Sequence, residues 1–318
     1  MNTMGNDDQA IWALSGLEAE MTGFQPVPGK AQWLDIAQNV FSQQTGRRIE
    51  NGGCEGALRW LLFEGTEGYN YVNSASSIGY FEVGAQLAYL TGNTTYIDLA
   101  DDTFELLEVL DFVTVDYAVY DGAHMDSCTD VNKLQLSYTA AMLLEGSAYL
   151  YNLTSDDDWK ERIDGLLDRI LMTFFENGVA LETSCEKGNR CNTDMLFYKG
   201  IMLRRLASAM EMAPYTAARI LPVLKSSAKA AAAHCTGGDN GRMCGFRWTS
   251  GHFDGETGAA QQADVLSALL AVIDVHSAGG SGNGSGKGFD MPQGTGARAG
   301  MSVSAFVGAL LAGGFLLL

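Results

Sequence analysis

Apolar residues recur at helical spacing along most of the chain. In the first segment Ile11, Leu14 and Leu17 follow this spacing. Asn6 suits the N-cap of this helix, and Gln9, three residues later, completes a capping-box pattern. The same periodicity, with abundant alanine and leucine, predicts further helices over residues 31–43, 76–91, 95–110, 133–151, 156–177, 194–212, 214–234 and 257–276.

Short polar turns separate several of these helices, for example residues 91–93 and 152–155. Helices joined in this way pack as antiparallel hairpins. Strand-like patterns are confined to residues 116–120 and 179–182. We therefore predict an all-α fold, in which hairpins stack as a solenoid or close into a toroid and long loops at one end line a cleft.

The C-terminal part of the sequence has a different character. Residues 277–300 are rich in glycine and serine, as in a flexible linker, and residues 301–318 carry no charge and end in Phe-Leu-Leu-Leu. Small residues, a polar spacer and a terminal apolar tail are the signal for a glycosylphosphatidylinositol (GPI) anchor, with Asn283 or a neighbouring residue as the attachment site. A simple tail anchor is the alternative. The globular domain is then expected to cover residues 1–276.

The N-terminus lacks a segment that a GPI-anchored protein requires. Entry into the secretory pathway needs a signal peptide with an apolar stretch, whereas residues 1–8 are polar. We therefore expect the sequence to begin late, without the first helices of its fold.

Charge and cysteine content restrict the possible partners and compartment. The net charge of −18 disfavours nucleic-acid binding, because phosphate backbones are repelled. The six cysteines lack zinc-site spacing and read as disulfides, Cys185–Cys191, Cys235–Cys244 and Cys54–Cys128, rather than free thiols. Three acceptor sequons, at Asn93, Asn152 and Asn283, also fit a secreted glycoprotein.

Asp7 and Asp8, adjacent at a helix start, are the sharpest candidates for chemistry. Acidic residues at a helix N-terminus also simply stabilise the helix dipole. The functional alternative is glycoside cleavage, which uses two carboxylates, one of them protonated as the acid. Loops rich in aromatics and carboxylates, such as those holding Trp60 and Asp121, suit sugar ligands. Ordinary packing explains Trp60 equally well. A turn-forming role before Gly122 explains Asp121 nearly as well as a ligand role.

Several ordered motifs resemble glycoside hydrolase family 76, in particular its fungal "defective in filamentous growth" and "defective cell wall" members. They are Gly-Asn-Asp-Asp-Gln-Ala-Ile-Trp at 5–12, Cys-Glu-Gly-Ala-Leu-Arg-Trp at 54–60, Gly-Tyr-Asn-Tyr-Val-Asn-Ser at 68–74, Val-Tyr-Asp-Gly-Ala at 119–123, Cys-Asn-Thr-Asp at 191–194 and Cys-Gly-Phe-Arg-Trp at 244–248. The resemblance extends from Gly5 to about Leu270.

This resemblance implies that residues 1–276 form a catalytic toroid of helical hairpins. The implied reaction is retaining, endo-acting cleavage of α-1,6-mannosidic bonds, with Asp7 as nucleophile and Asp8 as acid/base. The substrate is wall mannan or the mannose core of a GPI glycan, with wall glucan as a possible acceptor in transfer. No cofactor or metal is implied. The expected location is the outer face of the plasma membrane or the cell wall, through a lipid anchor.

Further residues are implied as substrate ligands: Asn73, Asp121, Trp60, Arg59 and Gln135. The segment at 133–139 departs from the family pattern, with Leu136 in place of tryptophan and Thr139 in place of asparagine. These departures leave alternatives open: a non-catalytic mannan-binding protein or inactive copy on the same scaffold, or another toroid enzyme such as a glucosidase or lyase. The four histidines share no metal-binding spacing.

Overall fold

The computed structural model describes residues 3–279, with side chains as far as Ile273. The linker, Asn283 and the apolar tail lie outside the described residues. Nine α-helices occupy this part of the chain: α1 (Asn6–Met21), α2 (Trp33–Thr45), α3 (Ser74–Thr91), α4 (Thr94–Val109), α5 (Ser137–Thr154), α6 (Asp157–Thr173), α7 (Tyr198–Met212), α8 (Ala217–Ala233) and α9 (Ala259–Gly279). The predicted all-α class is confirmed.

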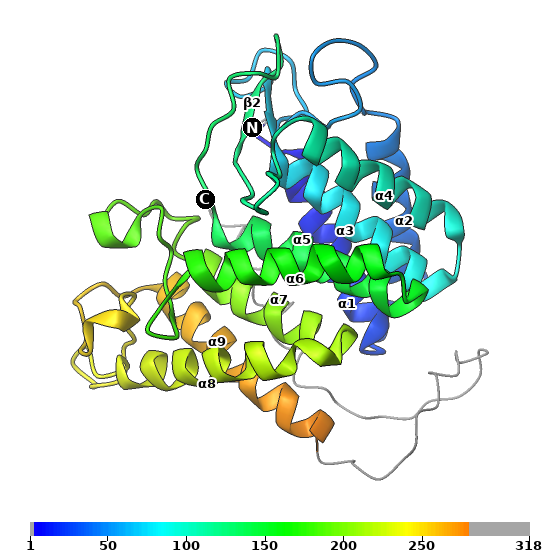
Figure 1. Cartoon of the computed structure of the whole chain (residues 1–318). Coiled ribbons are helices and arrows are strands. Elements are labelled where there is room, and N and C mark those ends of the chain that lie inside the picture. Colours follow the sequence, from blue (N-terminus) through cyan, green and yellow to red (C-terminus); the bar gives the residue numbers. More distant parts are fainter. Residues whose placement is uncertain (1–2, 280–318) are drawn as a thin grey trace.

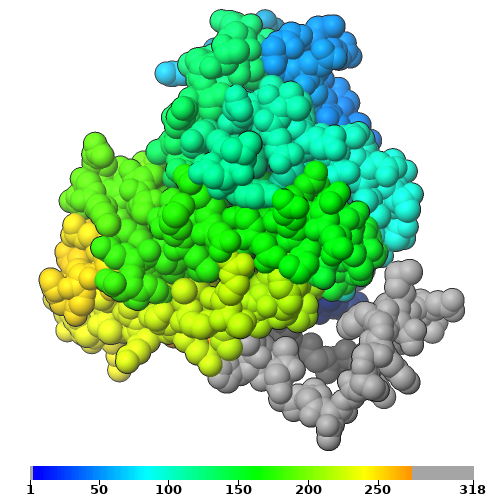
Figure 2. Space-filling view, viewed as in Figure 1, coloured from blue at the N-terminus to red at the C-terminus, as the bar shows by residue number. Residues whose placement is uncertain are grey.

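The helices form two layers of hairpins (Figure 1). The inner helices contact one another in the order α1, α3, α5, α7, α9, and the outer helices α2, α4, α6 and α8 each pack against the inner helix next to them in sequence. Outer helices α4, α6 and α8 lie across the middle of the face shown in Figure 2. This arrangement is the predicted toroid of helical hairpins, followed as an arc from α1 to α9.

Burial distinguishes the layers. Every residue from Ser74 to Ala88 in α3 is buried, so this inner helix is enclosed on all sides. In α6 the buried residues Trp159, Ile163, Leu166, Leu167 and Ile170 form a single stripe, as expected of an outer helix with one face in solvent. The rings of Phe81, Phe104 and Trp159, 5.7–5.9 Å apart, join α3, α4 and α6 in the core.

The few strands are short and lie at the loop end of the helices. β1 (Tyr71–Asn73) pairs antiparallel with β2 (Gly122–His124), and β3 (Phe175–Glu176) pairs with β4 (Val179–Ala180). The strand expected over residues 116–120 is wrong, since this segment makes only the isolated bridge between Val113 and Val119. The β1–β2 pair fixes the loop after α4 beside the start of α3.

Candidate active site

The first helix begins one residue earlier than its sequence predicts. Gly5 is the N-cap, and the carboxylate of Asp8 accepts a hydrogen bond from the Gly5 N–H at 2.7 Å. The expected capping box of Asn6 and Gln9 is therefore wrong. Asn6 instead serves the fold, since its side chain donates to the Arg59 carbonyl at 2.7 Å and its own carbonyl accepts from Gln44. These contacts fix the helix start to a neighbouring loop.

A side chain at position 5 would not fit this helix start. A Cβ built on Gly5 would lie 2.9 Å from the Trp60 carbonyl oxygen and closer still to the Asp7 carboxylate. The Asn6 N–H also donates to Trp60 O at 2.9 Å. Glycine thus allows the loop to approach closely enough to fix Asp7 and Asp8.

The two aspartates are held by neutral donors. Asp7 Oδ2 accepts from Asn73 Nδ2 at 2.8 Å, and Asp7 Oδ1 accepts from the Asp8 N–H at 2.9 Å. Within residues 3–279 neither carboxylate has a cationic partner. A carboxylate pair without a cation resists losing both protons, because two negative charges are then close together.

The pKa of each aspartate reflects this environment. Burial, and secondarily the charge of Asp8, raise the pKa of Asp7 to about 7, against the hydrogen bonds from Asn73 and the Asp8 N–H. Burial also raises the pKa of Asp8, opposed by the Gly5 N–H and reinforced by the charge of Asp194. The pair therefore holds a proton well above the usual range of a carboxylic acid, which is what general-acid chemistry requires.

Both aspartates open into a cavity of 490 Å³. One face of α1 forms a wall along most of its length, and α5 and α7 form others. The lining residues are Thr3, Asp7, Asp8, Ile11, Leu14, Ser15, Glu18, Trp60, Tyr71, Asn73, Gln86, Asp121, Leu136, Tyr138, Glu145, Asp194, Phe197, Tyr198, Ile201, Arg204, Arg205 and Ser208. Apolar, aromatic and hydrogen-bonding groups thus line the same cavity as the carboxylates, as expected of a site for a sugar.

Asn73 and Asp121, both predicted ligands, lie together in this cavity. Asn73 is the N-cap of α3, where its Oδ1 accepts from Ser76 while its Nδ2 reaches Asp7. Asp121 Oδ2 accepts from the Tyr71 hydroxyl at 2.7 Å and from Asn132 Nδ2 at 3.0 Å. The β1–β2 pairing joins the two, since Asn73 is opposite Gly122.

The other predicted ligands occupy different positions. Trp60 lines the cavity with 38% of its surface exposed, and its ring meets Tyr71 edge to face. Arg59 is not among the lining residues, and its guanidinium lies 4.4 Å from the ring centre of Tyr69. Gln135 is also outside the lining, and its Oε1 accepts from Arg169 at 3.1 Å. A substrate contact by Arg59 or Gln135 stays a prediction.

Sequence reasoning missed several cavity residues because two helices begin later than expected. The helix predicted from residue 133 begins at Ser137, and the helix predicted from 194 begins at Tyr198. Residues 133–136 and 194–197 are therefore loops, which bring Leu136 and Asp194 to the cavity. The rings of Tyr138 and Tyr198, 4.2 Å apart, add an aromatic wall. The helical spacing of apolar residues continues into both loops, so the sequence predicts helix there.

The three disulfides have the pairing expected from the sequence. Cys54–Cys128 joins two loops at the open end of the hairpins, and Cys185–Cys191 and Cys235–Cys244 each close a short loop. The sequon residues Asn93 and Asn152 are exposed.

Among residues 3–279 no group of His, Cys, Asp and Glu is arranged to hold a metal ion.

Comparison with known proteins identifies the family. The model of glycosyl hydrolase family 76 matches residues 1–278. The chain belongs to this family. A putative mannan endo-1,6-alpha-mannosidase of Schizosaccharomyces pombe is 37% identical over 273 residues, covering 85% of this chain and 62% of the relative. The mannan endo-1,6-alpha-mannosidase DFG5 of Candida albicans is 37% identical, with 85% and 61% covered. The chain thus spans about six-tenths of these relatives' length.

Solved structures of the family share the fold. Dfg5 from Chaetomium thermophilum, in complex with glucosamine, superposes with a TM-score of 0.81 at 42% identity, covering 85% of this chain and 68% of that one. The α-1,6-mannanase GH76A of Salegentibacter sp. HEL1_6 superposes with a TM-score of 0.67 at 14% identity, covering 85% and 75%. The second likeness concerns the fold alone.

Proposed function

We propose that this family 76 protein cleaves α-1,6-mannosidic bonds by a retaining mechanism carried out by Asp7 and Asp8. The observation that carries the proposal is the adjacent carboxylate pair, which opens into the cavity and has no cationic partner among the residues that the structure describes. Burial raises the pKa of both carboxyls. The names of the relatives, which are mannan endo-1,6-alpha-mannosidases, support the choice of bond.

In the first step Asp8 donates its proton to the glycosidic oxygen while Asp7 attacks the anomeric carbon. The glycosidic bond breaks, and a mannosyl ester forms on Asp7. In the second step Asp8 takes a proton from an acceptor hydroxyl, whose oxygen attacks the same carbon and releases Asp7. The pair must hold one proton at the start of the cycle. The attack needs the proton on Asp8 and an ionised Asp7. The two carboxyls titrate as a coupled pair, so the proton that they share is on Asp8 in the reactive arrangement.

The acceptor distinguishes hydrolysis from transfer. Water as acceptor gives an endo-mannosidase, whereas a hydroxyl of wall glucan gives a transglycosidase that links a GPI protein to the wall through its mannose core. Trp60, Tyr138 and Tyr198 supply apolar faces against which sugar rings of donor or acceptor can stack. We propose the transfer reaction at the cell wall or the outer membrane face.

Attachment to the membrane is proposed through the C-terminal lipid-anchor signal. Within residues 3–279 no helix has the length and apolarity needed to cross a bilayer. The proposed anchor site at Asn283 and the tail at 301–318 lie outside the described residues. Release of the protein from membranes by a phosphatidylinositol-specific phospholipase tests this part of the proposal.

The test of the activity uses α-1,6-mannan oligosaccharides, with β-glucans as the comparison substrate. Turnover of the mannoside and a loss of about 10³-fold or more in Asp7→Asn and in Asp8→Asn are expected, because each variant lacks one of the two carboxylates. Asp239→Asn, which removes an exposed charge outside the cavity lining, serves as the control. Mannan binding without turnover in the unaltered protein would favour the non-catalytic reading, and turnover of β-glucans alone would favour another toroid enzyme.

A further inference from the structure

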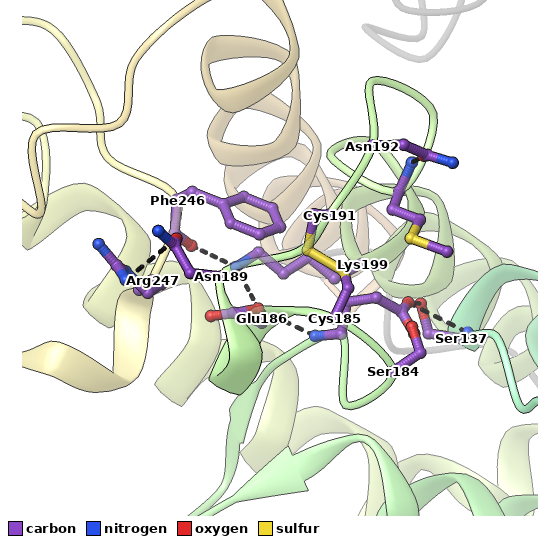
Figure 3. The surroundings of a disulfide bond; sticks show 12 residues. Ser137, Ser184, Cys185, Glu186, Asn189, Cys191, Asn192, Lys199, Phe246 and Arg247 are labelled. Atoms are coloured by element: carbon purple, nitrogen blue, oxygen red, sulfur yellow. Dashed lines mark hydrogen bonds and ion pairs between the residues drawn. A yellow bond between two sulfur atoms is a disulfide. The ribbon is translucent and has the colours of Figure 1, made fainter.

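The segment between β4 and α7 is fixed at its base to the protein core. Cys185 and Cys191 are joined by a disulfide with their Cα atoms 4.7 Å apart, which closes the loop containing the 3₁₀ turn Glu186–Gly188 (Figure 3). The carboxylate of Glu182 accepts from the N–H of Ser137 at 3.2 Å and from its hydroxyl. The base of this segment is thus tied to the start of α5.

A buried lysine fixes the other end of the segment. Lys199 is fully buried, and its Nζ contacts Glu186 Oε2 at 3.1 Å and the carbonyl oxygen of Phe246. The rings of Phe246 and Trp248 lie 3.9 and 4.2 Å from the same nitrogen. Figure 3 shows Lys199 with Glu186 and Phe246 beside the disulfide. Residues 192–198 therefore extend between two anchored points.

This anchored segment presents Asp194 to the cavity that holds Asp7 and Asp8. The local turn is fixed by hydrogen bonds from the Met195 N–H to Asn192 Oδ1 at 2.9 Å and from the Phe197 N–H to the Asp194 carbonyl at 3.0 Å. Within residues 3–279 no cation pairs with the Asp194 carboxylate. The cavity thus holds the Asp194 carboxylate on an element separate from α1, in addition to those of Glu18, Asp121 and Glu145.

We infer that Asp194 is a positioning residue: the segment anchored beside the disulfide places its carboxylate in the cavity of Asp7 and Asp8, where its negative charge helps to keep a proton on that pair. The inference rests on the proposed function, in which that proton is delivered to the glycosidic oxygen. Asp194 itself neither attacks nor protonates the substrate in this scheme.

The electrostatic surroundings of Asp8 support this role. The charge of Asp194 acts to raise the pKa of Asp8, after burial and against the Gly5 N–H. The titratable and charged groups facing the same cavity are Asp7 and Glu18 of α1, Tyr71 of β1, Asp121 before β2, Tyr138 and Glu145 of α5, and Tyr198, Arg204 and Arg205 of α7. Arg205 is engaged by Glu82 and Glu145.

The first test is the pH dependence of kcat/KM for Asp194→Asn against the unaltered protein. The alkaline limb is expected to move to lower pH by about 0.3–1 unit, the size of a charge interaction across a solvated cavity. Asp194→Glu should restore the limb, and Asp239→Asn should leave it unchanged. The displacement should shrink in 1 M salt, because ions screen charges across solvent. A raised KM with an unmoved limb would show a substrate ligand instead and overturn the inference.

The second test does not need turnover. The side-chain carboxyl ¹³C resonances of Asp7 and Asp8 are followed through a pH titration in the unaltered protein and in Asp194→Asn. A lower titration midpoint of the pair in the variant supports the inference even if Asp7→Asn and Asp8→Asn reveal no catalysis, so the two proposals can fail separately. Identical titration curves would overturn it.

Discussion

Two carboxylate pairs on the inner helices of this protein are stabilised in opposite ways. Glu82 of α3 and Glu145 of α5, both almost fully buried, share the guanidinium of Arg205 from α7, which contacts Glu145 at 2.6 Å. The other pair, Asp7 and Asp8, receives neutral N–H donors and no cation from the part of the chain that the structure describes. A buried pair with a cation joins helices together, whereas a pair without one retains a proton.

The cost of the two arrangements differs accordingly. In the glutamate cluster the Arg205 charge opposes the effect of burial on the pKa of Glu82, so part of the desolvation penalty is returned. In the aspartate pair, burial and the neighbouring charge act together to raise the pKa of Asp7. We therefore expect that loss of the cation from the glutamate cluster destabilises the fold. Loss of a charge from the aspartate pair should leave the fold stable but abolish activity.

The largest expected effect on stability comes from removing the shared cation. Arg205→Leu leaves two buried carboxylates unpaired, which we expect to lower the free energy of unfolding by about 3–5 kcal/mol. Urea denaturation followed by circular dichroism measures this change. Replacement of Arg219, whose partners Asp164 and Asp168 are on the surface, is the matched control with an expected loss below about 1 kcal/mol. Equal losses in both variants would break the comparison.

A smaller loss is expected at the start of α1. Gly5→Ala places a Cβ against the Trp60 carbonyl and the Asp7 carboxylate, so the loop and helix must separate. We expect about 1–3 kcal/mol of destabilisation together with a lower kcat, because the aspartate pair moves relative to the cavity. Gly23→Ala is the comparison variant. Gly23 has a positive φ and nothing near the added Cβ, so this variant reports backbone strain alone, whereas Gly5→Ala reports the close approach. A kcat unchanged in Gly5→Ala would contradict the assigned packing.

Removing a charge from the catalytic pair should stabilise the fold. Burial and the charge of Asp8 raise the pKa of folded Asp7 to about 7, whereas the unfolded group titrates near its ordinary pKa of 3.8. Its contribution to stability is therefore greatest below pH 4 and is lost as the pH rises to 7. Asp7→Asn should gain about 1–3 kcal/mol at pH 8 and little at pH 3.5, where the wild-type carboxyl is also neutral. Melting temperatures at both pH values measure this, and destabilisation at pH 8 would argue for a structural role.

The smallest expected effect is the pH dependence of the reaction. The cycle begins with one proton on the aspartate pair, so kcat/KM should fall as the pH rises through about 7. Initial rates on an α-1,6-mannan oligosaccharide between pH 4 and 9, at constant ionic strength, measure this fall in kcat/KM. A rate that stays constant to pH 9 would show that the proton comes from another group.

Helices were predictable from the sequence wherever the determinants were local. The stripe of apolar residues in α6 and the turns after α3 and α5 placed those hairpins within a few residues. The beginning of α5 was not predictable, because Ser137 is held by Glu182 from a loop distant in sequence. The prediction of the α1 N-cap was wrong for the same reason. Gly5 is required there by the close approach of the Trp60 carbonyl, not by capping propensity.

The candidate site was predicted from the resemblance to family 76, not from the physical properties of its residues alone. By themselves Asp7 and Asp8 have the pattern of acids at a helix start, and Asp8 does make such a contact with the Gly5 N–H. Asn73 and Asp121 came from the family motifs, and their proximity follows from the β1–β2 pairing, which the sequence did not predict. Asp194 belongs to the family motif at 191–194 but was not assigned to the site, because its place in the cavity depends on a long-range approach that no local pattern records.

The most direct test of the account is the search for a mannosyl ester on Asp7. Asp8→Ala is incubated with an α-mannoside that has a good leaving group, so that the first step needs no acid while the second is slow. Mass spectrometry of the digested protein should then find the sugar on the peptide that contains Asp7, and Asp7→Asn should show none. Turnover without an adduct, or an adduct on another residue, would contradict the assignment of Asp7 as the nucleophile.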